Sequence, residues 1–183
     1  MAEDFSGRAG IVTGAASGIG RAAALKFAEG GAKVVVADLD TEGSDNTKAL
    51  IEQRGGEAIC VTTDVSQGGE VEALVKQTVA TYGRLDFAYN NAGIAGDIVP
   101  LVDYSEELWD RVIGINLKGV WLCMKYQIPE MLKQGGGAIV NTASVMGLIS
   151  SASNPIAYTA SKHGVVGLTK SAALTYAEAG IRV

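Results

Sequence analysis

The sequence predicts an α/β fold: a doubly wound parallel sheet with helices on both faces, in a three-layer α/β/α arrangement. Short apolar runs alternate with longer helical patterns along the whole chain, and glycines end most of these segments. With 48% hydrophobic and 19% charged residues, the 183-residue chain can also bury a compact core. Alternating strands and helices require right-handed crossovers, which make the strands parallel, and we expect the strand order 3-2-1-4-5.

The first half of the chain opens with a short apolar run over residues 8–13, which glycine follows, as expected for a buried parallel strand. Residues 18–30 form a predicted helix, because their apolar residues recur on one face and two glycines end the pattern. A β-branched run predicts a second strand at 33–38. The same alternation then predicts a helix over 42–54, a strand over 58–62, a helix over 67–82 and a strand over 85–89.

The second half begins with a longer loop to about residue 104. A long helix is expected over 105–133, and three glycines separate it from a fifth strand at 138–142. Asn154 and Pro155 have the character of an N-cap followed by a proline at the first helical position. The last helix is therefore expected to run from 155 to 179.

The domain organisation is simple, because no change of composition divides the chain and we predict a single domain over residues 1–183. The chain stops at residues 180–183, directly after the last helix, where a sixth strand should begin. A fifth strand without a neighbour would leave unpaired backbone groups at the edge of the sheet. We therefore expect a sheet that lacks its last strands and a chain that is incomplete at its C-terminus.

The composition argues against several classes of function. A net charge of −5 and a pI near 4.9 leave no basic surface for nucleic acid. The N-terminus lacks a basic signal-peptide region, and the apolar runs are far shorter than the ~18 residues of a membrane span. We therefore expect a cytoplasmic protein with no membrane partner. Cys60 and Cys123 are expected to be free thiols, and a single histidine predicts no metal site.

A glycine-rich turn lies between the first predicted strand and the first predicted helix, at residues 13–20 (TGAASGIG). Glycines allow a tight turn and let a pyrophosphate approach the backbone, while the helix N-terminus offers free N–H groups and a positive dipole end. An ordinary tight turn without a ligand is the alternative. The predicted cofactor-binding residues of this turn are Gly14, Ser17, Gly18, Ile19 and Gly20.

Asp38 ends the second predicted strand and follows Gly20 by 18 residues. This separation in the sequence is typical of a carboxylate that binds the cofactor ribose. Such a carboxylate accepts hydrogen bonds from both adenosine ribose hydroxyls and repels a 2′-phosphate. Leu39 follows it, and no arginine lies at 38–40, so NAD is favoured over NADP. A solvated loop carboxylate is the alternative, and Asp40 is discounted because it lies past the strand end.

Polar and small residues follow the third and fourth predicted strands, at the carboxyl edge where such sheets bind ligands. Asp64, with Val65 beside it, can accept a hydrogen bond from the adenine amino group. Asn90 and the small pair Ala92 and Gly93 can line the cofactor groove. For Asn91, a turn-stabilising role without ligand contact is equally plausible.

Tyr158 and Lys162 lie four residues apart and so share one face of the last predicted helix. A phenol with a pKa of ~10 is a poor base at neutral pH, and an adjacent ammonium stabilises the phenolate. Ser144 follows the fifth predicted strand, where its hydroxyl can bond a substrate oxygen whose proton Tyr158 exchanges. Asn116, an isolated polar residue within the long helix, either holds a water next to Lys162 or bonds a backbone kink.

Together these motifs resemble the short-chain dehydrogenase/reductase family, over residues 6–183. The matching positions, in the family's order and approximate spacing, are Thr13-Gly14, Gly18-Ile19-Gly20, Asp64, residues 90–93, Asn116, Ser144, Tyr158 and Lys162. The resemblance implies a Rossmann-like fold and an NAD-dependent oxidoreductase that transfers a hydride between nicotinamide and a secondary alcohol or ketone. Members of the family continue past the equivalent of Val183, which is where this sequence departs from the pattern.

The resemblance also implies roles for the catalytic candidates. Tyr158 acts as the general acid/base, Lys162 lowers its pKa and holds the nicotinamide ribose, and Ser144 orients the carbonyl or alcohol. Asn116 maintains a proton relay. Many members are tetramers or dimers joined through two long helices, which correspond to 105–133 and 156–178 here, so a homo-oligomer is expected. Trp109, Trp121 and Leu122 suit either that interface or the core.

Other functions have less support. An NADPH-linked 3-oxoacyl-type reductase conflicts with Asp38. A cofactor-binding fragment without turnover conflicts with the intact serine, tyrosine and lysine set, although the missing C-terminal part favours it. A serine hydrolase is excluded, because the sequence has no Gly-x-Ser-x-Gly elbow and its one histidine, His163, is turned ~100° away from Lys162 on the helix. Apolar residues over 94–104 and 146–153 favour a hydrophobic alcohol substrate.

Overall fold

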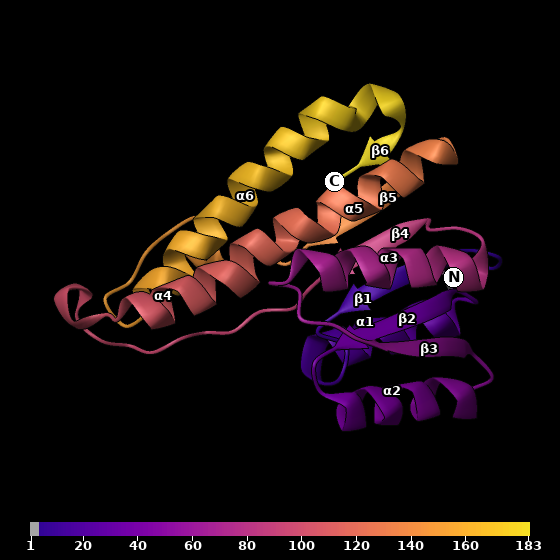
Figure 1. Cartoon of the computed structure of the whole chain (residues 1–183), viewed down its shortest axis with the longest axis horizontal. Helices are drawn as coiled ribbons and strands as arrows, with labels where there is room; N and C mark the ends of the chain where they lie inside the picture. The colour runs from indigo at the N-terminus through magenta and orange to yellow at the C-terminus, as the bar shows by residue number, and fades with distance from the viewer. Residues whose placement is uncertain (1–3) are drawn as a thin grey trace.

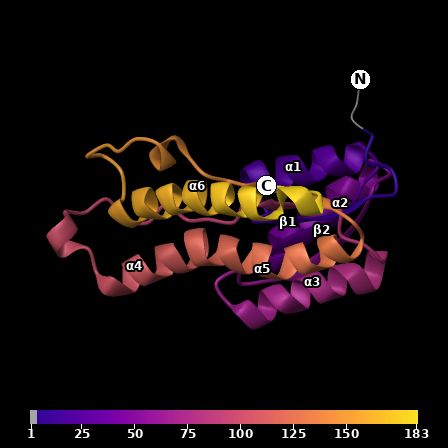
Figure 2. The same ribbon diagram turned by 90° about the horizontal axis from the view of Figure 1, so that it is seen from above.

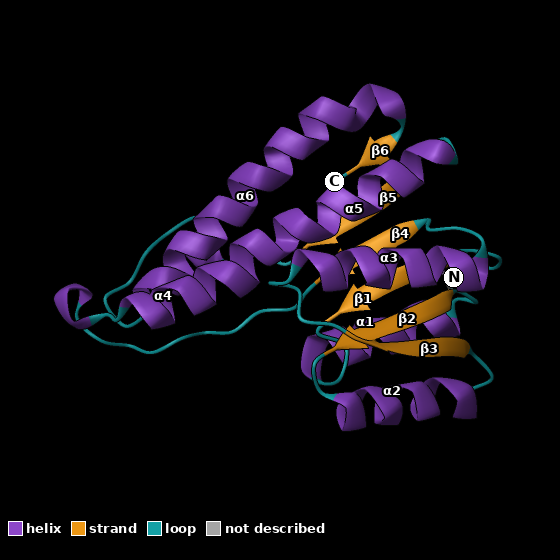
Figure 3. Cartoon of the chain, in the orientation of Figure 1, coloured by secondary structure: helices purple, strands orange, loops and turns teal. Residues whose placement is uncertain are grey.

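The computed structural model of the chain describes residues 4–183 (Figure 1). Within these residues, six strands form one sheet in the order β3-β2-β1-β4-β5-β6, and every neighbouring pair is parallel (Figure 3). The strands are β1 (Ala9–Thr13), β2 (Lys33–Asp38), β3 (Glu57–Thr62), β4 (Phe87–Asn90), β5 (Gly137–Asn141) and β6 (Ile181–Arg182). The doubly wound parallel sheet is confirmed, and its first five strands follow the predicted order.

Helices cover both faces of the sheet, and Figure 2 shows α1 and α3 on opposite sides of it. The α-helices are α1 (Gly18–Glu29), α2 (Thr41–Gln53), α3 (Gly68–Tyr82), α4 (Glu106–Ile113), α5 (Gly119–Lys133) and α6 (Ile156–Tyr176). Three short 3-10 turns lie at Leu101–Asp103, Val145–Gly147 and Ala177–Ala179. None of the helices described is both long and apolar enough for a bilayer span.

The core has one large apolar cluster on each face of the sheet, and a smaller third cluster contains Val65, Val71, Leu122 and Cys123. Adjacent residues of β1 point to opposite faces, so Ile11 joins a cluster with Leu74 and Met124, while Val12 joins another with Ala24. All five residues of β1 are buried. This two-sided burial explains why the strands appear in the sequence as continuous apolar runs rather than as alternating ones.

The predicted long helix over 105–133 is interrupted. Its residues form α4, a π-helical turn at Gly114–Lys118, and then α5. A π-helical turn takes up one extra residue, so it changes the direction of its side chains relative to a regular helix. Asn116 lies in this turn and is fully buried. Polar partners for Asn116 therefore explain the interruption, as described below.

The edge of the sheet differs from the expectation that the fifth strand has no neighbour. Gly180 takes a left-handed conformation with φ of +77°, and the chain then forms β6 next to β5. Ile181 pairs with Gly137 and is buried, and Arg182 pairs with Ala138. The expectation is therefore wrong over these two residues, because the apolar Ile181 side chain packs into the core cluster that α5 and α6 share.

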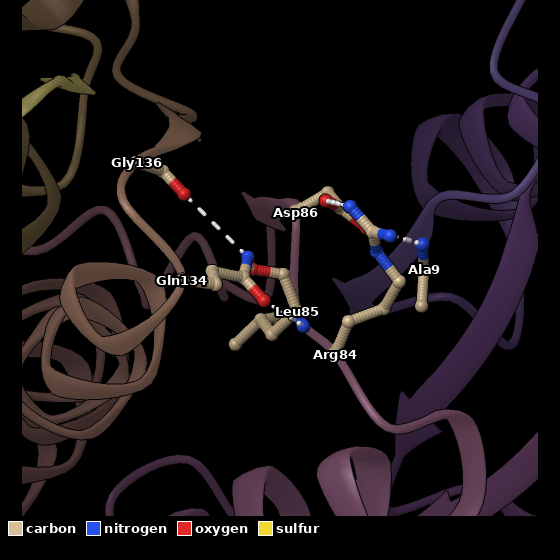
Figure 4. Close-up of polar contacts among 6 residues, drawn as sticks. All are labelled: Ala9, Arg84, Leu85, Asp86, Gln134 and Gly136. Carbon is tan, nitrogen blue, oxygen red and sulfur yellow. Dashed lines mark hydrogen bonds and ion pairs between the residues drawn. The ribbon is translucent and has the colours of Figure 1, made fainter.

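Polar side chains form hydrogen bonds at the amino ends of the central strands, as Figure 4 shows. Asp86 accepts a hydrogen bond from the Ala9 N–H at 2.8 Å and another from Arg84 Nε at 2.6 Å. Gln134 accepts from the Leu85 N–H at 3.3 Å and donates to the Leu85 carbonyl. The Asp86 carboxylate thus satisfies an amide at the start of β1, which the parallel ladder leaves unpaired.

Replacing Asp86 by alanine is expected to lower the free energy of unfolding by about 1–3 kcal/mol at neutral pH, because a backbone donor and a guanidinium lose their acceptor. Burial raises the pKa of the Asp86 carboxyl, but the bonds from Arg84 and Ala9 outweigh it and the pKa is lowered overall. A carboxyl with a lowered pKa in the folded state stabilises above its unfolded pKa and loses that effect as the pH falls through the folded value.

The difference in stability between the wild type and the Asp86→Ala variant should therefore shrink as the pH falls below about 4, near the ordinary carboxyl pKa. Urea unfolding across this pH range measures it. Asp110→Ala, at an exposed position of α4, serves as the control. A constant difference at all pH values would contradict the assignment of this stabilisation to the ionised carboxylate.

Candidate active site

The carboxyl ends of the central strands border one cavity of about 670 Å³. Twelve of the sixteen residues that the sequence proposed as site residues line it: Gly14, Ser17, Gly18, Ile19, Asp38, Leu39, Asp64, Val65, Ala92, Gly93, Tyr158 and Lys162. The other four, Gly20, Asn90, Asn116 and Ser144, do not line it. Six further residues complete the wall: Thr63, Asn91, Ile94, Ala95, Ile115 and Thr142.

The glycine-rich turn joins β1 to α1, and each glycine has a different reason to be there. Gly14 and Gly18 have φ values of +65° and +53°, a conformation that side chains disfavour. At Gly20 a Cβ would lie 2.0 Å from the Gly14 carbonyl oxygen. Gly20 therefore allows the helix to approach the turn, and Gly14 and Gly18 form the surface that faces the cavity.

Ser17 precedes the first turn of α1 in an extended conformation and makes no side-chain capping bond. The first N–H groups of a helix have no partner within the helix. With no capping side chain, these donors and the positive end of the helix dipole remain available at the cavity wall. The turn thus has the properties of an anion-binding site.

Asp38 connects this turn to the end of β2. Its Oδ2 accepts the Ala16 N–H at 3.0 Å, and its Oδ1 accepts the Asp40 N–H at 3.1 Å. Each carboxylate oxygen keeps further acceptor capacity toward the cavity. Asp40 has a different role, since it caps α2 by accepting the Gly43 N–H at 2.9 Å.

The two adjacent asparagines at the end of β4 have different surroundings. Asn90 is buried, and its amide forms a reciprocal pair with Gln127 of α5 at 3.1 and 2.9 Å. Its Nδ2 also donates to Asn141 of β5 at 2.9 Å. These bonds draw the Asn90 side chain into the protein and away from the cavity, which corrects the expectation that it lines the groove. Asn91 lines the cavity instead and donates to the Thr13 carbonyl at 3.1 Å.

Asp64 lines the cavity next to Val65, as expected. Its Oδ1 accepts the Ser66 N–H at 2.9 Å, and its own N–H donates to Glu70 at 2.7 Å. The Asp64 carboxylate is therefore held by the backbone at the start of α3 and retains a second oxygen for a ligand.

Asn116 bonds the backbone from within the π-helical turn. Its Oδ1 accepts the Ile94 N–H at 2.8 Å, and its Nδ2 donates to the Ile94 carbonyl at 2.8 Å. The same Nδ2 lies 3.2 Å from the Ser161 hydroxyl of α6. The Asn116 side chain thus bonds irregular backbone, and the segment that it holds is Ile94 on the cavity wall.

Tyr158 lies in the first turn of α6, with Lys162 one turn later on the same face. The Lys162 Nζ lies 5.5 Å from the centre of the Tyr158 ring and donates to the Thr142 carbonyl at 2.7 Å. Burial lowers the pKa of Lys162, which is 3% exposed. The helix begins at Ile156, one residue later than expected, with Pro155 at the cap. A phenol and an ammonium thus face the same cavity as the glycine-rich turn.

Ser144 follows β5 by three residues and caps the short turn at Val145–Gly147. Its Oγ accepts the Met146 N–H at 3.2 Å, so the hydroxyl proton remains free to be donated. Ser144 lies two residues beyond Thr142, which does line the cavity. The signal for Thr142 was present in the sequence, because it is the last residue of the fifth predicted strand and so lies at its carboxyl end.

Comparison with known proteins agrees with this geometry. The family model described as short chain dehydrogenase matches residues 8–183. The chain is 44% identical over 183 residues to a cyclohexanol dehydrogenase from Acinetobacter sp. (strain SE19), covering all of this chain and 72% of that protein. It is 46% identical to a cis-4-hydroxycyclohexanecarboxylate dehydrogenase from Sinomonas cyclohexanicum, again over all of this chain and over 73% of that protein.

Solved structures show the same likeness. A crystal structure of levodione reductase superimposes with a TM-score of 0.95 at 40% identity, covering 98% of this chain and 70% of that one. A crystal structure of NAD+-bound xylitol dehydrogenase also gives 0.95, at 36% identity, covering 99% of this chain and 69% of that one. By the matched family model, the sequence identity and the shared fold, this chain belongs to the short-chain dehydrogenase/reductase family.

Proposed function

We propose that this chain is an NAD-linked dehydrogenase of secondary alcohols, with Tyr158 as the general acid/base. The observation that carries the proposal is a single cavity that holds the glycine-rich turn and Asp38 at one end and Tyr158 with Lys162 at the other. Nicotinamide, when bound, supplies the hydride chemistry. What the protein must supply is binding, orientation and a path for one proton.

The residues of the cavity suit a dinucleotide. The uncapped N-terminus of α1 offers donors for a pyrophosphate, and Asp38 offers acceptors for ribose hydroxyls. At Gly93 a Cβ would lie 3.2 Å from Asn116 Oδ1 and 3.7 Å from Lys162 Nζ. Glycine at this position therefore keeps the floor of the cavity open beside Lys162, where a nicotinamide ribose would lie.

In the proposed reaction the Tyr158 phenolate accepts the hydroxyl proton of the alcohol, and the Ser144 hydroxyl, whose O–H is free, donates a hydrogen bond to the substrate oxygen. The Lys162 ammonium favours the phenolate form of Tyr158 through its charge. Its bond to the Thr142 carbonyl holds the ammonium in place. Asn116 contributes by fixing Ile94, which forms part of the cavity wall.

The substrate class that we favour is an alicyclic secondary alcohol. Met146 is buried, and Leu148 and Ile149, 71% and 56% exposed, follow Ser144 on an open apolar surface. Such a surface suits a hydrocarbon ring better than a polyol. The dehydrogenases named above for cyclohexanol and for a hydroxycyclohexanecarboxylate support this choice.

We also favour a homo-oligomer formed through α4, α5 and α6. Large apolar side chains remain exposed on these helices: Trp109, Trp121, Leu132 and Leu174. Exposed apolar surface of this kind marks interaction sites. Lys125 lies 5.2 Å from the ring centres of both Trp121 and Tyr126, which fixes part of this surface.

Replacing Asp38 by arginine is expected to reverse the cofactor preference. The carboxylate that accepts ribose hydroxyls is lost, and a guanidinium can bind a 2′-phosphate. The Kd for NADH should rise about tenfold or more, equivalent to about 1.4 kcal/mol, and that for NADPH should fall. Fluorescence titration with both cofactors measures this change. Asp103→Arg, which makes the same change of charge at an exposed position away from the cavity, is the control. An unchanged cofactor preference in the Asp38→Arg variant would refute the role of Asp38.

Replacing Tyr158 by phenylalanine is expected to lower kcat for cyclohexanol oxidation by about 10²–10⁴-fold, because the proton acceptor is lost. The Kd for NADH should change little, since the ring remains. Tyr176→Phe, at the far end of the same helix, is the matched control. Retention of most of the activity by the Tyr158→Phe variant would show that another group accepts the proton.

A further inference from the structure

Two carbonyl groups of the glycine-rich turn accept hydrogen bonds from side chains that do not line the cavity. The Thr47 hydroxyl of α2 donates a hydrogen bond to the Ala15 carbonyl, with an O···O distance of 2.9 Å. Arg21 of α1 donates from Nη2 to the Ala16 carbonyl and from Nε to Thr47 Oγ1 at 2.9 Å. A short chain of hydrogen bonds therefore runs from α1 through α2 to the turn.

This chain of bonds depends on close packing of α2 against the turn. Thr47 is fully buried, and its hydroxyl also lies 3.0 Å from the Gly43 carbonyl. At Gly43 a Cβ would lie 2.9 Å from the Ala16 Cβ. Gly43 therefore lets the first turn of α2 reach the glycine-rich turn. Because an unpaired buried hydroxyl is costly, the single proton of Thr47 is shared between the Ala15 and Gly43 carbonyls, and this contact constrains the direction of the Ala15 carbonyl.

The charge of Arg21 has no carboxylate partner among residues 4–183, where seven ion pairs occur. Arg21 lies in the first turn of α1, which contains no acidic residue. A positive charge at a helix N-terminus is unfavourable beside the helix dipole. An anion bound at this terminus would remove that unfavourable interaction, so the position of Arg21 favours a negatively charged ligand.

We propose that Arg21 and Thr47 are positioning residues for the phosphate groups of the cofactor, an inference that rests on the function proposed above. They hold the Ala15 and Ala16 carbonyls on the far side of the turn. The backbone N–H groups at Ser17–Ile19 are thereby left to face the phosphates. Because the Ala16 N–H donates to Asp38, the same arrangement fixes the position of the phosphate-binding turn relative to the ribose-binding carboxylate.

Ligands that differ only in phosphate test this proposal. The Kd values of adenosine, ADP and NADH are measured by calorimetry for the wild type and for Thr47→Val, which keeps the shape of the side chain but not its hydroxyl. We expect the affinity for ADP and NADH to fall about tenfold and that for adenosine to change less than twofold. Thr47→Ser, which keeps the hydroxyl, should bind all three like the wild type.

Thr78→Val is the matched control, because Thr78 is also fully buried and donates to the Leu74 carbonyl within α3, away from the cavity. Its affinities should equal those of the wild type. Equal affinity of wild type and Thr47→Val for ADP, or an equal loss for adenosine, would overturn the proposal. If Thr47→Val did not fold, Thr47→Ala would carry the same test, since it also removes the hydroxyl and adds no methyl group beside the Ala15 carbonyl.

The outcome also separates this proposal from the function on which it rests. A wild-type protein that bound neither ADP nor NADH would refute the dinucleotide site itself, and the role of Arg21 and Thr47 with it. A wild type that binds both, beside a Thr47→Val variant that binds equally well, would leave the dehydrogenase intact and refute only the positioning role.

Discussion

The structure depends on one constraint in the glycine-rich turn after β1. One side of this turn faces the cavity, so its remaining backbone hydrogen-bonding groups need partners on the protein side. Thr13 begins this arrangement, because its Oγ1 accepts the N–H groups of Asn91 and Ala92 at 3.0 and 3.1 Å. Asp38 then accepts the Ala16 N–H. These bonds come from the loop after β4 and from the end of β2, so the position of the turn is determined by the strands on both sides of β1.

A second set of bonds acts similarly at the opposite end of the cavity. The π-helical turn places Asn116 between the Ile94 backbone and Ser161. Ser161 in turn donates to the Tyr158 carbonyl at 2.7 Å. One buried amide therefore relates the loop after β4 to the helix that carries the tyrosine and the lysine. A regular helix over the same residues would direct this amide elsewhere, which gives the irregular turn a physical reason.

The sequence was sufficient for the first five strands of the sheet, because two-sided burial makes these strands apolar and glycines end the helices between them. It was also sufficient for most of the cavity wall, since polar residues directly after strands must lie at one edge. It could not separate Asn90 from Asn91, because which side chain turns inward depends on the distant partner Gln127. Nor did it reveal Arg21 and Thr47, whose contact exists only once α1 and α2 are packed.

The inward asparagine has a consequence for how this protein can vary. Asn90, Gln127 and Asn141 form a row of amides, and Asn141 extends it by donating to Thr169 of α6 at 3.0 Å. Each member presents the donor or acceptor that its neighbour lacks. Removing one side chain would leave the polar group of its neighbour without a partner inside the protein. The row therefore couples four separate segments of the chain, β4, α5, β5 and α6, through hydrogen bonds.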